Sequence, residues 1–413
     1  MVRRLLPRET VAPSPSPPPA RGPLWPDGPA GAATSLDRFP IVVHSHVPWS
    51  PAFSRPYQTH TRLSERHPVL FVERPVFSSA ESPDEIRVRH PLPHLAVAQP
   101  VLSAYADAAA TVESRVRDAL RRSGLLEEVP PAVHWVYRPD LAARLELFAE
   151  PLAVVDDCVE DDPECESGDD EADFRRRADV VFTGGHAQFL SRRATHPRVG
   201  LIEPAVDFDH FRNGARAPLP IDLERIPAPR AGFAGVLDAR LDYELVERLA
   251  AERPGLSIVL IGPIDGVPRK RLPSAPNVFL IGPRPYEDRP AYLGGFAVGL
   301  LPYRTEGARS LFHPAQVLEL LAAGRPVVST PLPEVARRYG DVVAIAEPEG
   351  FAAAVETALG PWPAAGSERA FARARAASWP RVVGEMEILV ARAIQDRGRT
   401  SRHFDPLERL LPG

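Results

Sequence analysis

Residues 296–330 read FAVGLLPYRTEGARSLFHPAQVLELLAAGRPVVST, and this stretch decides the fold. Residues 297–301 form a short apolar run of the kind found in buried parallel strands, and a proline ends it. Pro314 suits the first turn of a helix, and Gly324 suits the position just beyond its end. Residues 326–329 then predict a second strand. Strand, helix and strand in succession indicate a parallel sheet with a helical crossover.

Within the predicted helix, Gln316 and Glu319 are three residues apart and share a face. A carboxylate near the start of a helix, beside its outward-pointing backbone N–H groups, suits a sugar nucleotide. The amides then face the diphosphate, and Glu319 faces the ribose hydroxyls. The alternative is a surface glutamate that interacts only with the helix dipole. In both cases we expect the carboxylate of Glu319 to be exposed.

Residues 313–330, HPAQVLELLAAGRPVVST, resemble the signature of the group 1 (family 4) glycosyltransferases, roughly N/E-P-x-K-x-x-E-x-x-A-x-G-x-P-V-V. Glu319 and the Gly and Pro-Val-Val that follow it match this pattern. Gln316 stands where the bacterial cell-envelope branch usually has Lys, and Leu311 stands where the longer pattern has the first of two glutamates. These departures leave two possibilities open: the donor is held differently here, or transfer activity has been lost.

Composition excludes several classes of protein. The chain has 413 residues, enough for two domains of about 150 to 200 residues each. A net charge of −5 does not indicate a nucleic-acid-binding protein. Lys270 is the only lysine, and it does not stand in a P-loop motif. Two cysteines are too few for a disulfide framework or a standard zinc site, which favours a cytoplasmic protein. We expect no signal peptide and no membrane span.

The order of apolar runs, helical patterns and Pro-rich segments predicts an α/β protein made of two facing Rossmann-like domains, the GT-B type in the family that it resembles. An interdomain cleft is expected between them. The predicted segments are a disordered Pro-rich tail (1–37), an N-terminal acceptor domain (38–212), a linker (213–230), a C-terminal donor domain (231–378), and a helix that crosses back to the first domain, with a tail (379–413). Residues 87–101 predict edge strands of the first domain.

Candidate acceptor-side residues follow two predicted strands of the first domain. The loop at residues 45–55 lies at the carboxyl edge of the sheet, where such folds bind ligands, and His46 is a candidate there. A structural loop histidine is the alternative. Residues 156–173 contain eleven acidic residues, but a solvated loop explains them better than a metal site because no EF-hand spacing occurs. Their start, VVDDCVED, resembles the family's VxYDCxDE segment, which implies that Asp157 and Glu160 face the acceptor.

Candidate donor-side residues lie at the ends of the strands of the second domain. Glycine follows each of three predicted strands, either to let the backbone approach a phosphate or only to turn the chain. The segment NVFLIGPRPYEDRPAYL is similar to the family segment that contacts the nucleotide base. Arginines in these loops suit a diphosphate, although solvent-facing arginines are common. The predicted set is Gly235, Arg240, Gly262, Gly282, Arg284, Arg304, Arg309, His313, Gln316 and Glu319. We expect the three glycine turns and Glu319 to converge on one pocket.

The resemblance implies transfer of a sugar from a nucleotide diphosphate sugar to a saccharide or lipid-linked envelope acceptor. It also implies retention at the anomeric carbon, no cofactor and no bound metal, and a cytoplasmic enzyme that associates peripherally with the inner face of the membrane. Positive groups and amides would stabilise the leaving diphosphate. Two alternatives stay open: a catalytically silent nucleotide-binding scaffold, and a sugar-nucleotide epimerase of the same fold, for which no acid/base pair is identified.

Overall fold

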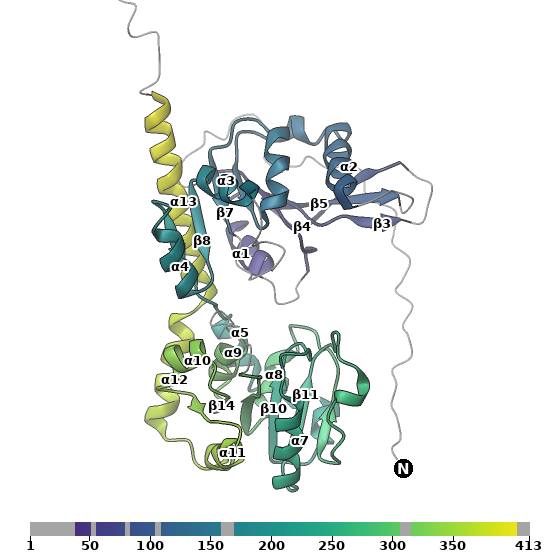
Figure 1. Cartoon of the computed structure of the whole chain (residues 1–413), viewed down its shortest axis with the longest axis vertical. Helices are drawn as coiled ribbons and strands as arrows, with labels where there is room; N and C mark the ends of the chain where they lie inside the picture. The colour runs from purple at the N-terminus through teal and green to yellow at the C-terminus, as the bar shows by residue number, and fades with distance from the viewer. Residues whose placement is uncertain are drawn as a thin grey trace, which may run out of the picture.

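The computed structural model describes residues 38–50, 55–78, 83–103, 109–157, 169–305 and 315–402. The chain forms two α/β domains, one built on a nine-stranded sheet and the other on a six-stranded sheet (Figure 1). Several predicted features lie outside the described residues: the tail at 1–37, Glu160, Arg309, His313, and most of the acidic stretch.

The first sheet has the strand order β3-β5-β2-β1-β6-β7-β8-β9, with β4 added antiparallel to β5. Its strands are β1 (Ile41–His44), β2 (Val69–Val72), β3 (Val76–Ser78), β4 (Glu85–Leu92), β5 (Leu95–Ser103), β6 (Val133–Val136), β7 (Ala153–Asp156), β8 (Val180–Thr183) and β9 (Val199–Leu201). The prediction of edge strands at residues 87–101 holds for β4, which pairs only with β5 among the described strands. It is wrong for β5, which pairs with β4 on one side and with β2 and β3 on the other. Its short apolar run is buried for that reason.

Helices cover both faces of this sheet, which is why its central strands are buried at every residue. The helical elements are α1 (Arg55–Leu63), α2 (Ala109–Arg122), η1 (Leu126–Glu128), η2 (Pro139–Leu147), α3 (Asp169–Arg177), α4 (His186–Arg193) and α13 (Trp379–Arg402). The core on one face joins Leu63 of α1 and Met386 of α13 to Trp135 and Phe182 of the sheet. The core on the other face includes Leu120 of α2.

The second sheet is entirely parallel, with the order β12-β11-β10-β13-β14-β15. Its strands are β10 (Arg230–Ala234), β11 (Ser257–Ile261), β12 (Val278–Leu280), β13 (Val298–Leu301), β14 (Val327–Ser329) and β15 (Ala344–Ile345). The helical elements around it are α7 (Tyr243–Glu252), η4 (Arg269–Arg271), α8 (Arg289–Gly294), α9 (Gln316–Ala322), α10 (Pro333–Tyr339), α11 (Phe351–Leu359) and α12 (Ala364–Ala376). Residues 296–330 therefore contain β13, α9 and β14, as their pattern predicts.

The chain crosses between the domains twice, and the two crossings are bonded to each other. The N–H of Val206 donates to the carbonyl of Ala377 (2.9 Å), and the N–H of Trp379 donates to the carbonyl of Val206 (3.2 Å). After the second crossing, α13 runs along the first domain (Figure 1). After the first crossing come α5 (Phe208–Gly214) and α6 (Ile221–Glu224), and Phe211 lies in the core of the second domain. That core therefore begins before the predicted linker.

Candidate functional site

The turns after β10, β11 and β12 are in direct contact at the carboxyl edge of the second sheet. The N–H of Gly235 donates to the carbonyl of Ile261 (2.9 Å), and the N–H of Gly262 donates to the carbonyl of Gly282 (3.1 Å). Gly262 has a φ of +149°, and a Cβ on it would lie 1.7 Å from the carbonyl oxygen of Gly235. Only glycine allows this approach of two backbones.

The first turn of α9 packs against this glycine edge. The side-chain nitrogen of Gln316 lies 2.5 Å from where a Cβ on Gly235 would be. The hydroxyl of Tyr303, which follows β13, also hydrogen-bonds to Gln316. Gln316 is therefore held between the β10 turn and the β13 loop, and Glu319 lies one helical turn further along.

Glu319 is buried, with only 1% of its surface exposed, so the expectation of an exposed carboxylate is wrong. The physical reason is that α9 packs against α5 and α12, and every residue from Val317 to Ala322 is buried. Its Oε2 accepts a hydrogen bond from Arg289 (2.7 Å). Its Oε1 is buried and has no hydrogen-bond partner among the described residues. Burial raises the pKa of Glu319 to about 7, although Arg289 opposes the shift.

Two of the predicted donor-side arginines are neighbours. The N–H of Arg304 donates to the carbonyl of Arg240 (2.8 Å), beside an antiparallel bridge between Leu241 and Tyr303. The side chain of Arg240 is 57% exposed and pairs with Asp238. These backbone contacts place both arginines in the loops next to Tyr303 and Gln316, and Nε of Arg304 donates to the carbonyl of Leu241 (3.3 Å).

Arg284 makes different contacts. It binds Asp222 of α6 (2.6 Å) and the hydroxyl of Tyr292 (2.7 Å). The structure thus ties Arg284 to α6, whereas Gly235, Gly262, Gly282, Gln316 and the two neighbouring arginines share one edge.

On the acceptor side, Asp157 follows β7 and is completely buried. Its Oδ1 lies 2.6 Å from Nη2 of Arg55, and its Oδ2 accepts a hydrogen bond from the indole of Trp135 (2.9 Å). Burial raises the pKa of Asp157 to about 6, against the effect of Arg55. Oδ2 is thus hydrogen-bonded, and Oδ1 faces a guanidinium at ion-pair distance without hydrogen-bond geometry. A direct role for Asp157 in catalysis stays a prediction.

His46 lies in the loop after β1 and is half-buried. This loop is fixed by Glu73, which follows β2 and is fully buried. The carboxylate of Glu73 accepts a hydrogen bond from the N–H of Trp49 (2.7 Å) and pairs with Arg89 (2.7 Å). The described part of the acceptor edge is therefore held by buried carboxylates that already have partners.

Sequence reasoning missed a line of contacts that joins the two domains near Glu319. Arg62 of α1 pairs with Asp207 at the first crossing (3.1 Å). His210 of α5 stacks on Tyr286, with ring centroids 4.7 Å apart, and Tyr286 lies under the guanidinium of Arg289. Arg289 was detectable, because it lies in the segment that resembles the family's base-contacting region and precedes the proline of α8.

Among the described residues, no cluster of three or more His, Cys, Asp or Glu side chains is arranged to hold a metal ion. No described helix is both long enough and apolar enough to cross a membrane.

Sequence comparison identifies the family of the second domain. Residues 230–360 match the family model for glycosyl transferases group 1. The second domain is a group 1 glycosyltransferase domain. The chain is also 29% identical, over 174 residues, to the Bacillus subtilis (strain 168) protein named as teichuronic acid biosynthesis glycosyltransferase TuaH. That match covers 40% of this chain and 44% of the relative, so the chain spans less than half of the relative's length in this alignment.

Solved structures extend the likeness from this glycosyltransferase domain to the whole fold. The sucrose-phosphate synthase of Thermosynechococcus elongatus has a TM-score of 0.63 and 14% identity, and the likeness covers 87% of this chain and 100% of that one. An Escherichia coli protein bound with UDP-2-fluoro glucose has a TM-score of 0.62 and 13% identity, covering 85% and 99%. Anabaena HepE in complex with UDP and glucose has a TM-score of 0.59 and 12% identity, covering 84% and 98%. The predicted GT-B fold is confirmed.

Proposed function

We propose that this protein transfers a sugar from a nucleotide diphosphate sugar to a saccharide or lipid-linked acceptor. One observation carries the proposal: Oε1 of Glu319 is a buried acceptor without a partner among the described residues. Such an atom costs about 1 to 3 kcal/mol if nothing donates to it. A ribose hydroxyl of a bound nucleotide would supply the missing donor.

The surroundings of Glu319 suit the rest of a sugar nucleotide. Of the three glycine turns, the one after β12 leaves open space for a diphosphate, because nothing lies within 4 Å of a Cβ position on Gly282. The Cβ positions of Gly235 and Gly262 are filled by Gln316 and by the carbonyl of Gly235. Arg240 and Arg304 adjoin this edge, and guanidinium groups bind phosphates with two parallel hydrogen bonds. Two of the similar structures hold UDP or a UDP-sugar, which supports UDP as the first nucleotide to test.

In the proposed reaction, the bond between the anomeric carbon and the diphosphate breaks, and an acceptor hydroxyl forms the new bond as it loses its proton. Arg240 and Arg304 stabilise the negative charge that develops on the leaving diphosphate. The first domain binds the acceptor through the loop that carries His46, and Asp157 positions Arg55 at that edge. We expect retention at the anomeric carbon, as in the family. The partial likeness to a protein named for teichuronic acid biosynthesis supports an envelope acceptor. We expect this acceptor to be reached at the inner face of the membrane.

A catalytically silent nucleotide-binding protein is the second candidate, and Gln316 favours it. The family's lysine is replaced here by an amide, which hydrogen-bonds to Tyr303. One positive charge that could face a phosphate is therefore missing. Such a protein would bind a nucleotide but would not transfer the sugar.

The test is a titration of wild type and Glu319→Gln with UDP, GDP and ADP, followed by an assay of sugar transfer from the matching donor. Loss of a charge-assisted hydrogen bond, worth about 1.5 to 3 kcal/mol, should weaken nucleotide binding by roughly 10-fold to 150-fold. Glu356→Gln is the control, because Glu356 is 61% exposed on α11. Unchanged affinity in Glu319→Gln would reject the donor site. Binding without transfer to any acceptor would support the silent protein instead.

A further inference from the structure

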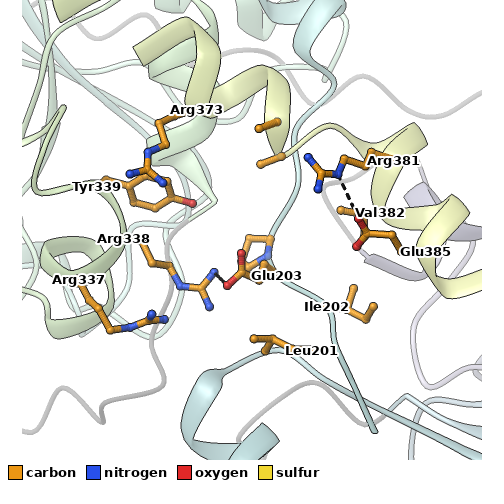
Figure 2. A pocket seen from close by; sticks show the side chains of 13 residues that line it. Leu201, Ile202, Glu203, Arg337, Arg338, Tyr339, Arg373, Arg381, Val382 and Glu385 are labelled. Carbon is orange, nitrogen blue, oxygen red and sulfur yellow. Dashed lines mark hydrogen bonds and ion pairs between the residues drawn. The ribbon is translucent and has the colours of Figure 1, made fainter. Parts of the chain in front are cut away.

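A second candidate site lies at the crossings between the domains. It is a cleft of about 420 Å³. Its walls come from the exit of β9, the end of α10, the end of α12 and the start of α13 (Figure 2). None of the predicted donor or acceptor residues that the structure describes lines it.

Four arginines line this cleft, which we call the hinge cleft: Arg337, Arg338, Arg373 and Arg381. The first three belong to the second domain, and Arg381 lies on α13, which packs on the first domain (Figure 2). Two glutamates, Glu203 and Glu385, line it as well. The hinge cleft therefore presents cationic groups from both domains to one space.

Each of the four arginines pairs with a carboxylate, so the charges must be weighed individually. Arg373 pairs with Asp341 (3.2 Å) and Arg381 with Glu385 (3.0 Å), and all four side chains in these pairs are about half exposed. Exposed pairs of this kind contribute little to stability. A guanidinium has five N–H donors, and each of these pairs occupies one of them. Donors therefore remain for a ligand.

Arg338 supplies the observation that points to a ligand. Its side chain is only 7% exposed; Nε binds Glu334 (2.9 Å), and Nη1 binds Glu203. Its Nη2 is buried and has no hydrogen-bond partner among the described residues. A buried cationic donor without an acceptor is unfavourable, and an anion in the hinge cleft would satisfy it.

We propose that the hinge cleft binds the phosphate group of a small phosphorylated molecule. Phosphate oxygens match the planar fork of guanidinium better than any other common small anion, apart from carboxylate. Leu201, Ile202 and Val382 form an apolar part of the lining, against which a carbon skeleton can pack (Figure 2). Such a ligand contacts both domains at once. This site is separate from the proposed donor site and does not depend on it.

The test is isothermal titration of the full-length protein with inorganic phosphate and with a hexose phosphate, at low ionic strength. We expect both to bind, and we expect Arg373→Ala/Arg381→Ala to weaken both by about 10-fold or more, because two charge-assisted hydrogen bonds are lost. The matched control is Arg87→Ala/Arg121→Ala. It removes the same charge and two equally exposed pairs on β4 and α2, and its affinity should stay at the wild-type value.

Three outcomes would overturn the proposal: no binding at millimolar phosphate, equal weakening in both double variants, or weakening only in Arg240→Ala/Arg304→Ala. The last result would place the phosphate at the donor edge.

Tighter binding of the hexose phosphate than of inorganic phosphate, lost in Arg373→Ala/Arg381→Ala, would identify a phosphate ester as the ligand. Equal binding, lost in the same variant, would identify the free anion. Failure of nucleotide binding in a separate titration would count against the donor site alone.

Discussion

Asp157 and Glu319 are both fully buried carboxylates at the ligand edges of their domains, yet their surroundings differ. In Asp157 one oxygen pairs with Arg55 and the other accepts from Trp135. In Glu319 only one oxygen has a partner, Arg289, among the described residues. The first is a closed network in which Oδ1 faces the guanidinium of Arg55 at ion-pair distance, although without hydrogen-bond geometry. In the second, the ion pair is made by Oε2, and Oε1 has room for one more donor. Burial alone therefore does not distinguish a structural carboxylate from one that binds a ligand.

The two carboxylates also share an electrostatic cost. Burial raises the pKa of Asp157 from 3.8 to about 6 and that of Glu319 from 4.5 to about 7. A raised pKa means that the folded state holds the proton more tightly than the unfolded state. Each group therefore reduces the free energy of unfolding as pH rises from its unfolded pKa through its folded pKa. This cost is tolerated for structure at Asp157 and, in our proposal, for ligand binding at Glu319.

The largest expected effect is a loss of stability when Asp157 is removed from its network with Arg55 and Trp135. Asp157→Ala leaves Arg55 without its partner and the indole N–H of Trp135 without an acceptor. Removal of one partner from a buried ion pair costs about 3 to 5 kcal/mol, and we expect the lower end because Arg55 is 14% exposed. Denaturant unfolding measures this loss. Asp140→Ala, which removes an exposed pair with Arg138, should change stability by less than about 0.5 kcal/mol.

The next effect is a pH dependence of nucleotide binding that Glu319, but not Asp157, can cause. Ribose hydroxyls donate to the charged form of Glu319, so below its pKa of about 7 a proton must leave before the nucleotide binds. Affinity for UDP should therefore fall by roughly 10-fold between pH 8 and pH 6. The same titration of Glu319→Gln reports the pH dependence that belongs to the nucleotide itself. Equal slopes in the two proteins would rule out the linkage.

A smaller effect concerns the free energy of unfolding, which should respond differently to substitution of Glu319 and of Asp157. Glu319→Gln should raise the free energy of unfolding at pH 8 by about 1 kcal/mol, because it removes a buried charge but keeps the side chain's size. The lost pair with Arg289 offsets part of the gain. At pH 5 the carboxyl of Glu319 is protonated, so the gain should disappear. A loss of several kcal/mol at both pH values would instead make Glu319 a structural residue like Asp157.

The smallest effect concerns Arg284, which the sequence predicts to contact the nucleotide and the structure bonds to Asp222 and Tyr292. Because its guanidinium is already engaged, Arg284→Ala should change UDP affinity by less than about 3-fold. Equilibrium titration measures the change. A drop as large as that of Glu319→Gln would show that Arg284 moves to the nucleotide, as the sequence resemblance implies.

Local patterns predicted the elements well wherever burial and periodicity agree. The strands predicted at residues 297–301 and 326–329 are β13 and β14, each starting one residue later than predicted. The glycine after each of β10, β11 and β12 lies at the sheet edge as expected. Helix α12 was missed, because its sequence is a run of alanine and arginine with only Ala370 and Ala374 buried.

The burial and the partners of the candidate carboxylates depend on tertiary contacts, which the sequence could not show. The burial of Glu319 depends on α5 and α12, which lie far from α9 in sequence, and α5 falls close to the predicted linker. The partners of Asp157 likewise come from α1 and β6. A motif was enough to choose a candidate residue. It could not show whether the carboxylate of that residue has an oxygen without a hydrogen-bond partner.

Helix α13 gives the first domain an unusual order of assembly. The sheet face that carries Trp135 and Phe182 is covered by Met386 and Val390, which are among the last described residues to leave the ribosome. Domains usually fold in the order in which they are synthesised. Here the domain whose strands are made first is completed last, after the second domain has emerged. We therefore expect removal of α13 to expose this apolar face and to destabilise the N-terminal domain.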